Sequence, residues 1–206
     1  MTRAFYSSLF VTAAMAATGC VAAEGDESFI ILNNLVPDVD LETGEITFLP
    51  AREGPFFSQG FVSPEAPSFF VGSLFESRVQ AVDGRESLRT ILVEGANISL
   101  EVSEVSVVQG AVVQKSGSVD TIEFQVRFTS AISPNGGIAV GIYDVIPFEV
   151  MASIRGKIEA AAPPPDADVF VQVTSTTVAF GDFYGDRIDS SSFVFPVVVT
   201  NVAPTF

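Results

Sequence analysis

The side chains best suited to chemistry in this sequence are carboxylates, and they gather in two acidic segments. The first carries Asp38, Asp40, Glu42 and Glu45, which places oxygen atoms at alternate positions as an EF-hand loop does. Such a segment would bind Ca²⁺, a hard cation that takes about six to eight oxygen ligands. Thr43 stands at the sixth position, where that loop has glycine, and no flanking helices are evident. The alternative is a solvated turn.

The second acidic segment carries Asp182, Asp186 and Asp189 around Gly185, in a turn-rich stretch between two apolar runs. Ca²⁺ is again the ion to consider, but Arg187 within the segment would more simply pair with a neighbouring aspartate. A solvated turn is therefore the competing interpretation. Of the two segments, the first is the better candidate for a metal.

Catalysis by the common nucleophilic routes is excluded by composition. The chain has no histidine and one cysteine, and it contains neither a Gly-x-Ser-x-Gly nor a Ser-x-x-Lys motif. There is also no glycine-rich phosphate loop. The one enzymatic alternative left is a carboxylate-dependent glycan hydrolase, which would need two acids facing each other across a cleft. We expect a protein that is not an enzyme and has no cofactor apart from the Ca²⁺ considered above.

Two pairs of phenylalanines are candidate interaction residues: Phe56 with Phe57, and Phe69 with Phe70. Adjacent residues on a strand point to opposite faces of the sheet, so one ring of each pair would be uncovered if only one face is buried. An uncovered ring could serve as a sugar platform or as a protein-docking patch. The alternative is that both faces are covered there.

The start of the chain has the layout of an export signal. Arg3 is followed by an apolar run over 9–17, and Cys20, the single cysteine, comes directly after small residues. The sequence Ala17-Thr18-Gly19-Cys20 resembles the lipobox of bacterial lipoproteins, in which the cysteine is lipidated and becomes the first residue of the mature chain. We therefore predict a signal peptide over 1–19, lipidation at Cys20 and a tether over 20–27.

An ordinary signal peptidase site is the rival interpretation. Val21-Ala22-Ala23 has the small-x-small pattern for cleavage before Glu24, which would make the protein periplasmic or secreted. If Cys20 is lipidated and the host is Gram-negative, the absence of aspartate at position 21 implies sorting to the outer membrane.

Charge narrows the class of partner. The chain has 25 acidic and 10 basic residues and a net charge of −15. It has no basic stripe to neutralise phosphates, so nucleic acid is not expected as a partner. Anionic membrane surfaces would repel it, so membrane attachment must come from the lipid. An envelope protein or a glycan remains as a candidate partner.

The hydrophobic pattern is that of strands. Apolar and polar residues alternate over 97–102, 122–128, 148–158 and 169–173, while 193–199 is nearly all apolar. The phase slips by one residue near Ser103 and Glu104, which predicts a β-bulge or bend. Pro196 cannot donate to a ladder, so its strand should lie at an edge or a bulge. No segment has a convincing helical pattern.

Turn residues separate these strands. Asn135-Gly136 lies between two alternating segments and predicts a hairpin, and residues 94–97 predict a weaker turn. Short strands with such turns predict an all-β fold, an antiparallel β-sandwich with Greek-key connections of the immunoglobulin or jelly-roll kind, over residues 28–206. A closed barrel is the alternative.

Three stretches resemble a group of uncharacterised surface lipoproteins from myxobacteria-type Gram-negative bacteria. They are residues 30–37 (IILNNLVP), 89–100 (RTILVEGANISL) and 192–199 (SFVFPVVV). Members of this group often carry further cysteines, including near the final strand, where this sequence has Thr200 and Asn201. The resemblance implies a compartment and a fold and carries no assigned activity. Together these observations predict a lipid-anchored envelope protein with a binding or structural role; a secreted, self-assembling or adhesive subunit is the alternative.

Overall fold

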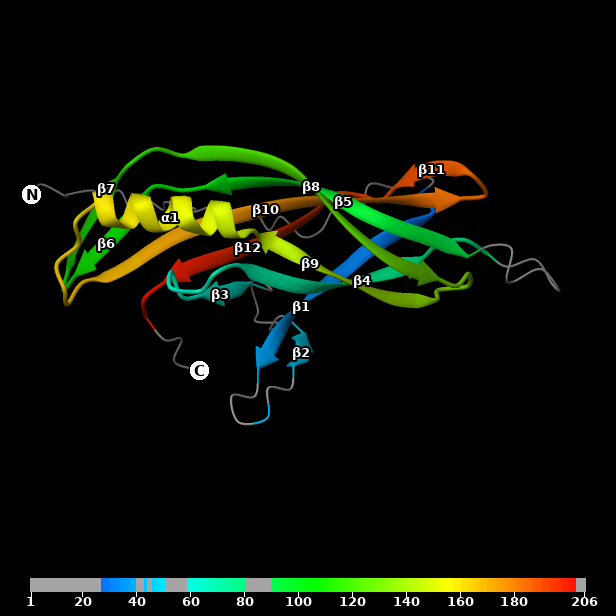
Figure 1. Ribbon diagram of the computed structural model, residues 1–206, viewed down its shortest axis with the longest axis horizontal. Helices are drawn as coiled ribbons and strands as arrows, with labels where there is room; N and C mark the ends of the chain where they lie inside the picture. Colours follow the sequence, from blue (N-terminus) through cyan, green and yellow to red (C-terminus); the bar gives the residue numbers. More distant parts are fainter. Residues whose placement is uncertain (1–26, 40–42, 44–45, 51–58, 81–89, 203–206) are drawn as a thin grey trace, which may run out of the picture.

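The computed structural model describes residues 27–39, 43, 46–50, 59–80 and 90–202, and these form two β-sheets and one helix (Figure 1). The smaller sheet has four strands in the order β2-β1-β4-β9. Their bounds are β1 Phe29–Val39, β2 Ile46–Pro50, β4 Phe69–Ser77 and β9 Ile138–Ile146. Every pair within this sheet is antiparallel.

The larger sheet has eight strands, and its central path runs β3-β12-β10-β5-β8. The strands of this path are β3 Gly60–Val62, β5 Ile91–Val102, β8 Asp120–Ile132, β10 Asp168–Phe183 and β12 Phe193–Thr200. Three shorter strands extend it: β6 Val105–Gln109, β7 Val112–Ser116 and β11 Asp186–Asp189. β3 pairs with β12 in parallel, and the other described pairs are antiparallel.

One hydrophobic core joins the inner faces of the two sheets. It includes Phe29 and Phe75 from the small sheet and Leu100, Val173 and Phe195 from the large one, all fully buried. Each of these strands alternates buried and more exposed residues, because one face packs on the core and the other faces solvent. The predicted all-β sandwich is therefore confirmed.

The prediction of a strand over 148–158 was wrong. These residues form helix α1, Phe148–Ala160, and its buried residues are Val150, Met151 and Ile154. Residues 150 and 154 are four apart, a spacing that fits both a strand face and a helix face, so the apparent alternation was ambiguous. Met151 distinguishes the two: it is fully buried beside Val150, whereas Phe148, on the supposed buried strand face, is exposed. Figure 1 shows α1 at the end of the molecule that carries β6 and β7.

The predicted irregularity at Ser103 and Glu104 is confirmed. β5 ends at Val102 and β6 begins at Val105, yet both pair with β10. Val102 lies opposite Val173 and Ser106 lies opposite Phe170, so one extra residue has been inserted on the β5–β6 side. The Ser103 amide donates to the Gln172 carbonyl, and the Ser103 hydroxyl accepts from the Gln172 amide.

The turn expected at residues 94–97 is a bulge instead. β5 continues through this stretch, and its register shifts near Gly95 against both β8 and β10. A Cβ atom on Gly95 would clash with the Val126 carbonyl oxygen and lie 2.7 Å from the Phe180 ring. Glycine is needed here for close approach across the sheet rather than for chain reversal.

The Asn135-Gly136 turn forms, but the strands around it are not a paired hairpin. Both residues have positive φ, 60° and 74°, as a tight reversal requires. Among the described strand pairs, β8 pairs with β5 and β9 pairs with β4, so the turn joins the edges of the two sheets. The turn residues fix the reversal, while burial of both inner faces decides where each strand pairs.

Pro196 occupies the position expected of a proline in a strand. β12 pairs with β10 over 193–200, but with β3 only over 197–199. Within the described strands, Pro196 therefore lies where β12 has a neighbour on one side alone.

In the described residues no helix is long and apolar enough to cross a membrane.

Candidate functional site

The first acidic segment falls largely outside the described residues. Asp40, Glu42 and Glu45 are among those not described, and Asp38 lies within β1, where its backbone pairs with that of Thr47 in β2. The predicted calcium loop therefore begins inside a strand. Ca²⁺ at this segment stays a prediction.

The second acidic segment is the hairpin formed by β10 and β11. Its turn is at Tyr184 and Gly185, which both have positive φ, and the Asp182 side chain accepts a hydrogen bond of 3.1 Å from the Gly185 amide. Asp189 lies opposite Phe180 and forms an ion pair of 3.6 Å with Arg187, as the sequence suggested.

The hairpin separates its three aspartates. Asp182 and Asp189 belong to the face shared with Arg187, while Asp186 belongs to the opposite face, because successive residues alternate. In the described part of the chain, no three histidine, cysteine, aspartate or glutamate residues are grouped as a metal site. Two of the three aspartate carboxylates, those of Asp182 and Asp189, already have a partner within the hairpin.

The two described phenylalanine candidates behave as adjacent strand residues should. Phe69 is buried in the core, while Phe70 is half-buried on the outer face of β4, opposite Asp144 of β9. Phe69 therefore packs in the core, and a role in interactions for the more exposed Phe70 stays a prediction. Phe56, Phe57 and Cys20 lie outside the described residues.

A second aromatic, which the sequence reasoning missed, is held between two arginines on the outer face of the large sheet. The guanidinium carbon of Arg127 lies 4.9 Å from the centre of the Phe180 ring, and that of Arg187 lies 4.6 Å from it. Although Phe180 is on the outer face, it is only 1% exposed, because both arginines cover it and Gly95 beside it has no side chain. This cluster stabilises the sheet through cation–π contacts.

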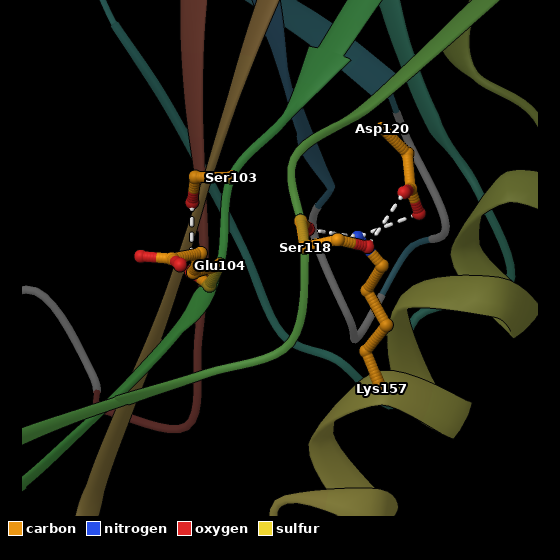
Figure 2. Close-up of polar contacts among 5 residues, drawn as sticks. All are labelled: Ser103, Glu104, Ser118, Asp120 and Lys157. Atoms are coloured by element: carbon orange, nitrogen blue, oxygen red, sulfur yellow. Dashed lines mark hydrogen bonds and ion pairs between the residues drawn. The ribbon is translucent and has the colours of Figure 1, made fainter.

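An ion pair fastens the C-terminal half of α1 to the start of β8 (Figure 2). The Lys157 ammonium lies 2.7 Å from an Asp120 carboxylate oxygen and donates a 2.9 Å hydrogen bond to the Ser118 carbonyl. The Ser118 hydroxyl donates to the other Asp120 oxygen. The hydrogen bond from Lys157, followed by that from Ser118, lowers the pKa of Asp120 below its ordinary value of 3.8. These contacts hold the helix in place and account for the lowered pKa of Asp120.

A chain of polar side chains runs through the interior between the sheets. The Ser73 hydroxyl donates to the amide oxygen of Asn34 at 2.5 Å and shares a 2.6 Å hydrogen bond with the Tyr143 hydroxyl. Tyr143 is also hydrogen-bonded to Thr177 of the opposite sheet, and Ser175 lies 3.3 Å from Thr177. Burial raises the pKa of the Tyr143 phenol above 10.0. The chain connects β1, β4 and β9 with β10 and so fixes how the sheets face each other.

Among the described residues, three of the exposed apolar side chains lie in one row on β9. Ile138, Val140 and Ile142 are 60%, 41% and 53% exposed, whereas Tyr143 on the other parity is buried. We call these three residues the apolar stripe. The stripe lies on the outer face of the small sheet, where Leu74 of β4 is opposite Val140. The sequence pattern did not predict the apolar stripe, because the residues on both faces of β9 are mostly apolar and do not alternate with polar ones.

No family model matches the sequence, and no curated protein matches it at a significant level.

Proposed function

We propose that this protein is an exported, lipid-anchored β-sandwich of the bacterial cell envelope, with a binding or structural role rather than a catalytic one. The observation that carries the proposal is the position of Cys20, the single cysteine, directly after an apolar run and three small residues. The thiol would take the diacylglycerol, and Val21 in place of aspartate would direct the protein to the outer membrane.

The position of the first strand supports this proposal. β1 begins at Phe29, which is fully buried, so the folded domain starts within ten residues of Cys20. A short tether would then hold a complete sandwich close to the membrane. The net charge of −15 suits a soluble envelope domain that contacts proteins or glycans and not nucleic acid.

The mass of the mature N-terminal peptide from the native membrane fraction tests the anchor. The expected result is a peptide that begins at Cys20 and is heavier by a diacylglycerol and an acyl chain. A Cys20→Ser variant is the matched control and should remain unmodified and leave the membrane fraction. An unmodified wild-type peptide that begins at Glu24 would overturn the proposal.

A second candidate function is that of a secreted subunit that self-assembles by strand addition. The observation in its favour is that residues 193–196 of β12 pair only with β10 among the described strands, and that Val194 is exposed there. A free strand edge can accept a strand of another chain. Oligomers that persist on dilution, and that a Val194→Lys substitution disperses, would favour this candidate. A monomer at all concentrations would remove it.

A further inference from the structure

We propose that the apolar stripe rests on the surface of the phospholipid bilayer in which the acylated Cys20 is anchored. This inference depends on the proposed lipid anchor and adds an orientation to it. The domain would not hang freely from its tether but would lie with the outer face of its small sheet toward the lipid.

The stripe is an unusual surface for a soluble domain. Three branched aliphatic side chains follow one another on the same face of an edge strand, and each has two-fifths or more of its surface in water. Gly72 of β4 lies opposite Ile142 and provides no side chain to cover it. Half-buried Leu74 and Phe70 extend the apolar area over β4. Contiguous apolar surface of this kind marks a site of contact with a partner or a membrane.

The length of chain behind Cys20 favours the membrane as that partner. The nine residue-to-residue steps from Cys20 to Phe29 span at most about 30 Å when fully extended, so the domain must stay near the bilayer. The tether also enters the fold beside the stripe. Ile30 lies opposite Glu76 of β4, which in turn lies opposite Ile138 of β9. Two strand spacings, about 10 Å, therefore separate the tether's entry strand from the first residue of the stripe.

Charge determines which kind of contact is available. With a net charge of −15, the protein cannot be held to an anionic surface by electrostatic attraction. Two acids flank the stripe. Glu76, opposite Ile138, forms an ion pair of 3.4 Å with Arg78, which reduces local repulsion. Exposed Asp144 continues the same row of β9 beyond Ile142. A neutral or zwitterionic lipid surface that buries aliphatic side chains at the boundary of headgroups and acyl chains is consistent with these features.

The experiment uses the absence of tryptophan from the chain. Ile142→Trp and Ile138→Trp place a single reporter in the stripe at two positions. Val113→Trp is the matched control, because Val113 is 60% exposed on β7 of the other sheet. Figure 1 shows β7 at the opposite end of the molecule from the start of β9. Each acylated protein is reconstituted into vesicles of phosphatidylcholine with brominated acyl chains, after circular dichroism has confirmed folding.

The expected result is that each stripe tryptophan loses about half of its emission in brominated vesicles, because interfacial side chains lie within reach of the acyl chains. Val113→Trp should show no loss. Unquenched stripe tryptophans in protein that is acylated and vesicle-bound would overturn the orientation but leave the anchor intact. If their emission is also blue-shifted in a dimer, a second copy covers the stripe instead. A protein that is never acylated would overturn the anchor and the orientation together.

Discussion

Ser73 of β4 and Tyr143 of β9 share a hydrogen bond of 2.6 Å in the interior of the protein. Neither hydroxyl is accessible enough to rely on water, so each needs its protein partners. Their chain ends at Asn34, whose side-chain nitrogen has no hydrogen-bond partner. The small sheet is therefore joined to β10 by directional bonds as well as by apolar packing, and this permits several quantitative tests.

Replacing Tyr143 with phenylalanine should destabilise the protein by about 1–2 kcal/mol, because Ser73 and Thr177 each lose a partner in a buried site. Urea unfolding followed by circular dichroism measures the change. Tyr184→Phe is the control and should have almost no effect, since Tyr184 is exposed. Equal stability of the two variants would contradict the proposed role of the polar chain.

Tyr143 should also make the protein sensitive to alkali. Burial raises its pKa in the folded state above the 10.0 of an ordinary tyrosine. Above about pH 10 the unfolded chain loses a proton that the folded protein keeps, so the free energy of unfolding falls as pH rises. Denaturant midpoints measured from pH 8 to 11 should fall at the alkaline end in the wild type. The fall should be smaller in Tyr143→Phe.

Asp120 provides a test at acid pH. Its contribution to stability is present above about pH 4 and is lost as pH falls through its lowered pKa in the folded state. Lys157→Met removes the main cause, so the pKa of Asp120 should return toward 3.8 in a carboxyl NMR titration. Ser118→Ala removes the second cause and should raise the pKa less. The reverse order would show that Lys157 is not the dominant partner.

Two glycine substitutions should change the stability of the folded protein in opposite directions. Gly95→Ala forces a Cβ atom against the Val126 carbonyl and the Phe180 ring, and should destabilise the protein by about 2–3 kcal/mol. Gly156→Ala in α1 meets no atom within 4 Å and should stabilise it by about 1 kcal/mol, because alanine favours helix. Thermal unfolding of both variants measures the difference. A neutral Gly95→Ala would show that the bulge can relax.

Two truncations in α1 distinguish a helix from the strand suggested by alternation. Met151→Ala removes a fully buried side chain and should cost about 2–4 kcal/mol. Phe148→Ala should cost about 0.5 kcal/mol or less, since its ring is exposed. A strand with Phe148 in the core would give the opposite ranking in chemical denaturation.

Strands were predictable from this sequence wherever apolar residues alternated with polar ones, so that one face of the strand was apolar and the other polar. Residues 122–128 and 97–102 meet that condition, and the slip at Ser103 and Glu104 was predictable for the same reason. The alternation of 148–158 was misleading, because residues spaced by four fit a helix equally well. Only Met151, on the supposed polar parity, carried a signal for helix.

Which strands pair with one another, and which side chains meet across the sheets, was less predictable than the positions of the strands themselves. Asn135-Gly136 specified a reversal, but not that its flanking strands would join different sheets. The stripe was hidden because Tyr143 and its neighbours make both faces of β9 apolar. Small hydroxyl residues at alternate positions, such as Ser175 and Thr177, were the available signal for the buried polar chain. Their hydrogen-bond partners lie on strands distant in sequence, so no local sequence pattern could predict them.

The placement of β12 has a consequence for how the protein is made. This strand lies between β3 and β10 and contributes Phe195, Val197 and Val199, all fully buried, to the core. Until residue 200 has emerged, β10 lacks its neighbour over 193–200 and the core stays open on that side. A nascent chain in that condition lacks the complete core, so under the proposed export it would still be unfolded enough to pass through a narrow secretory channel.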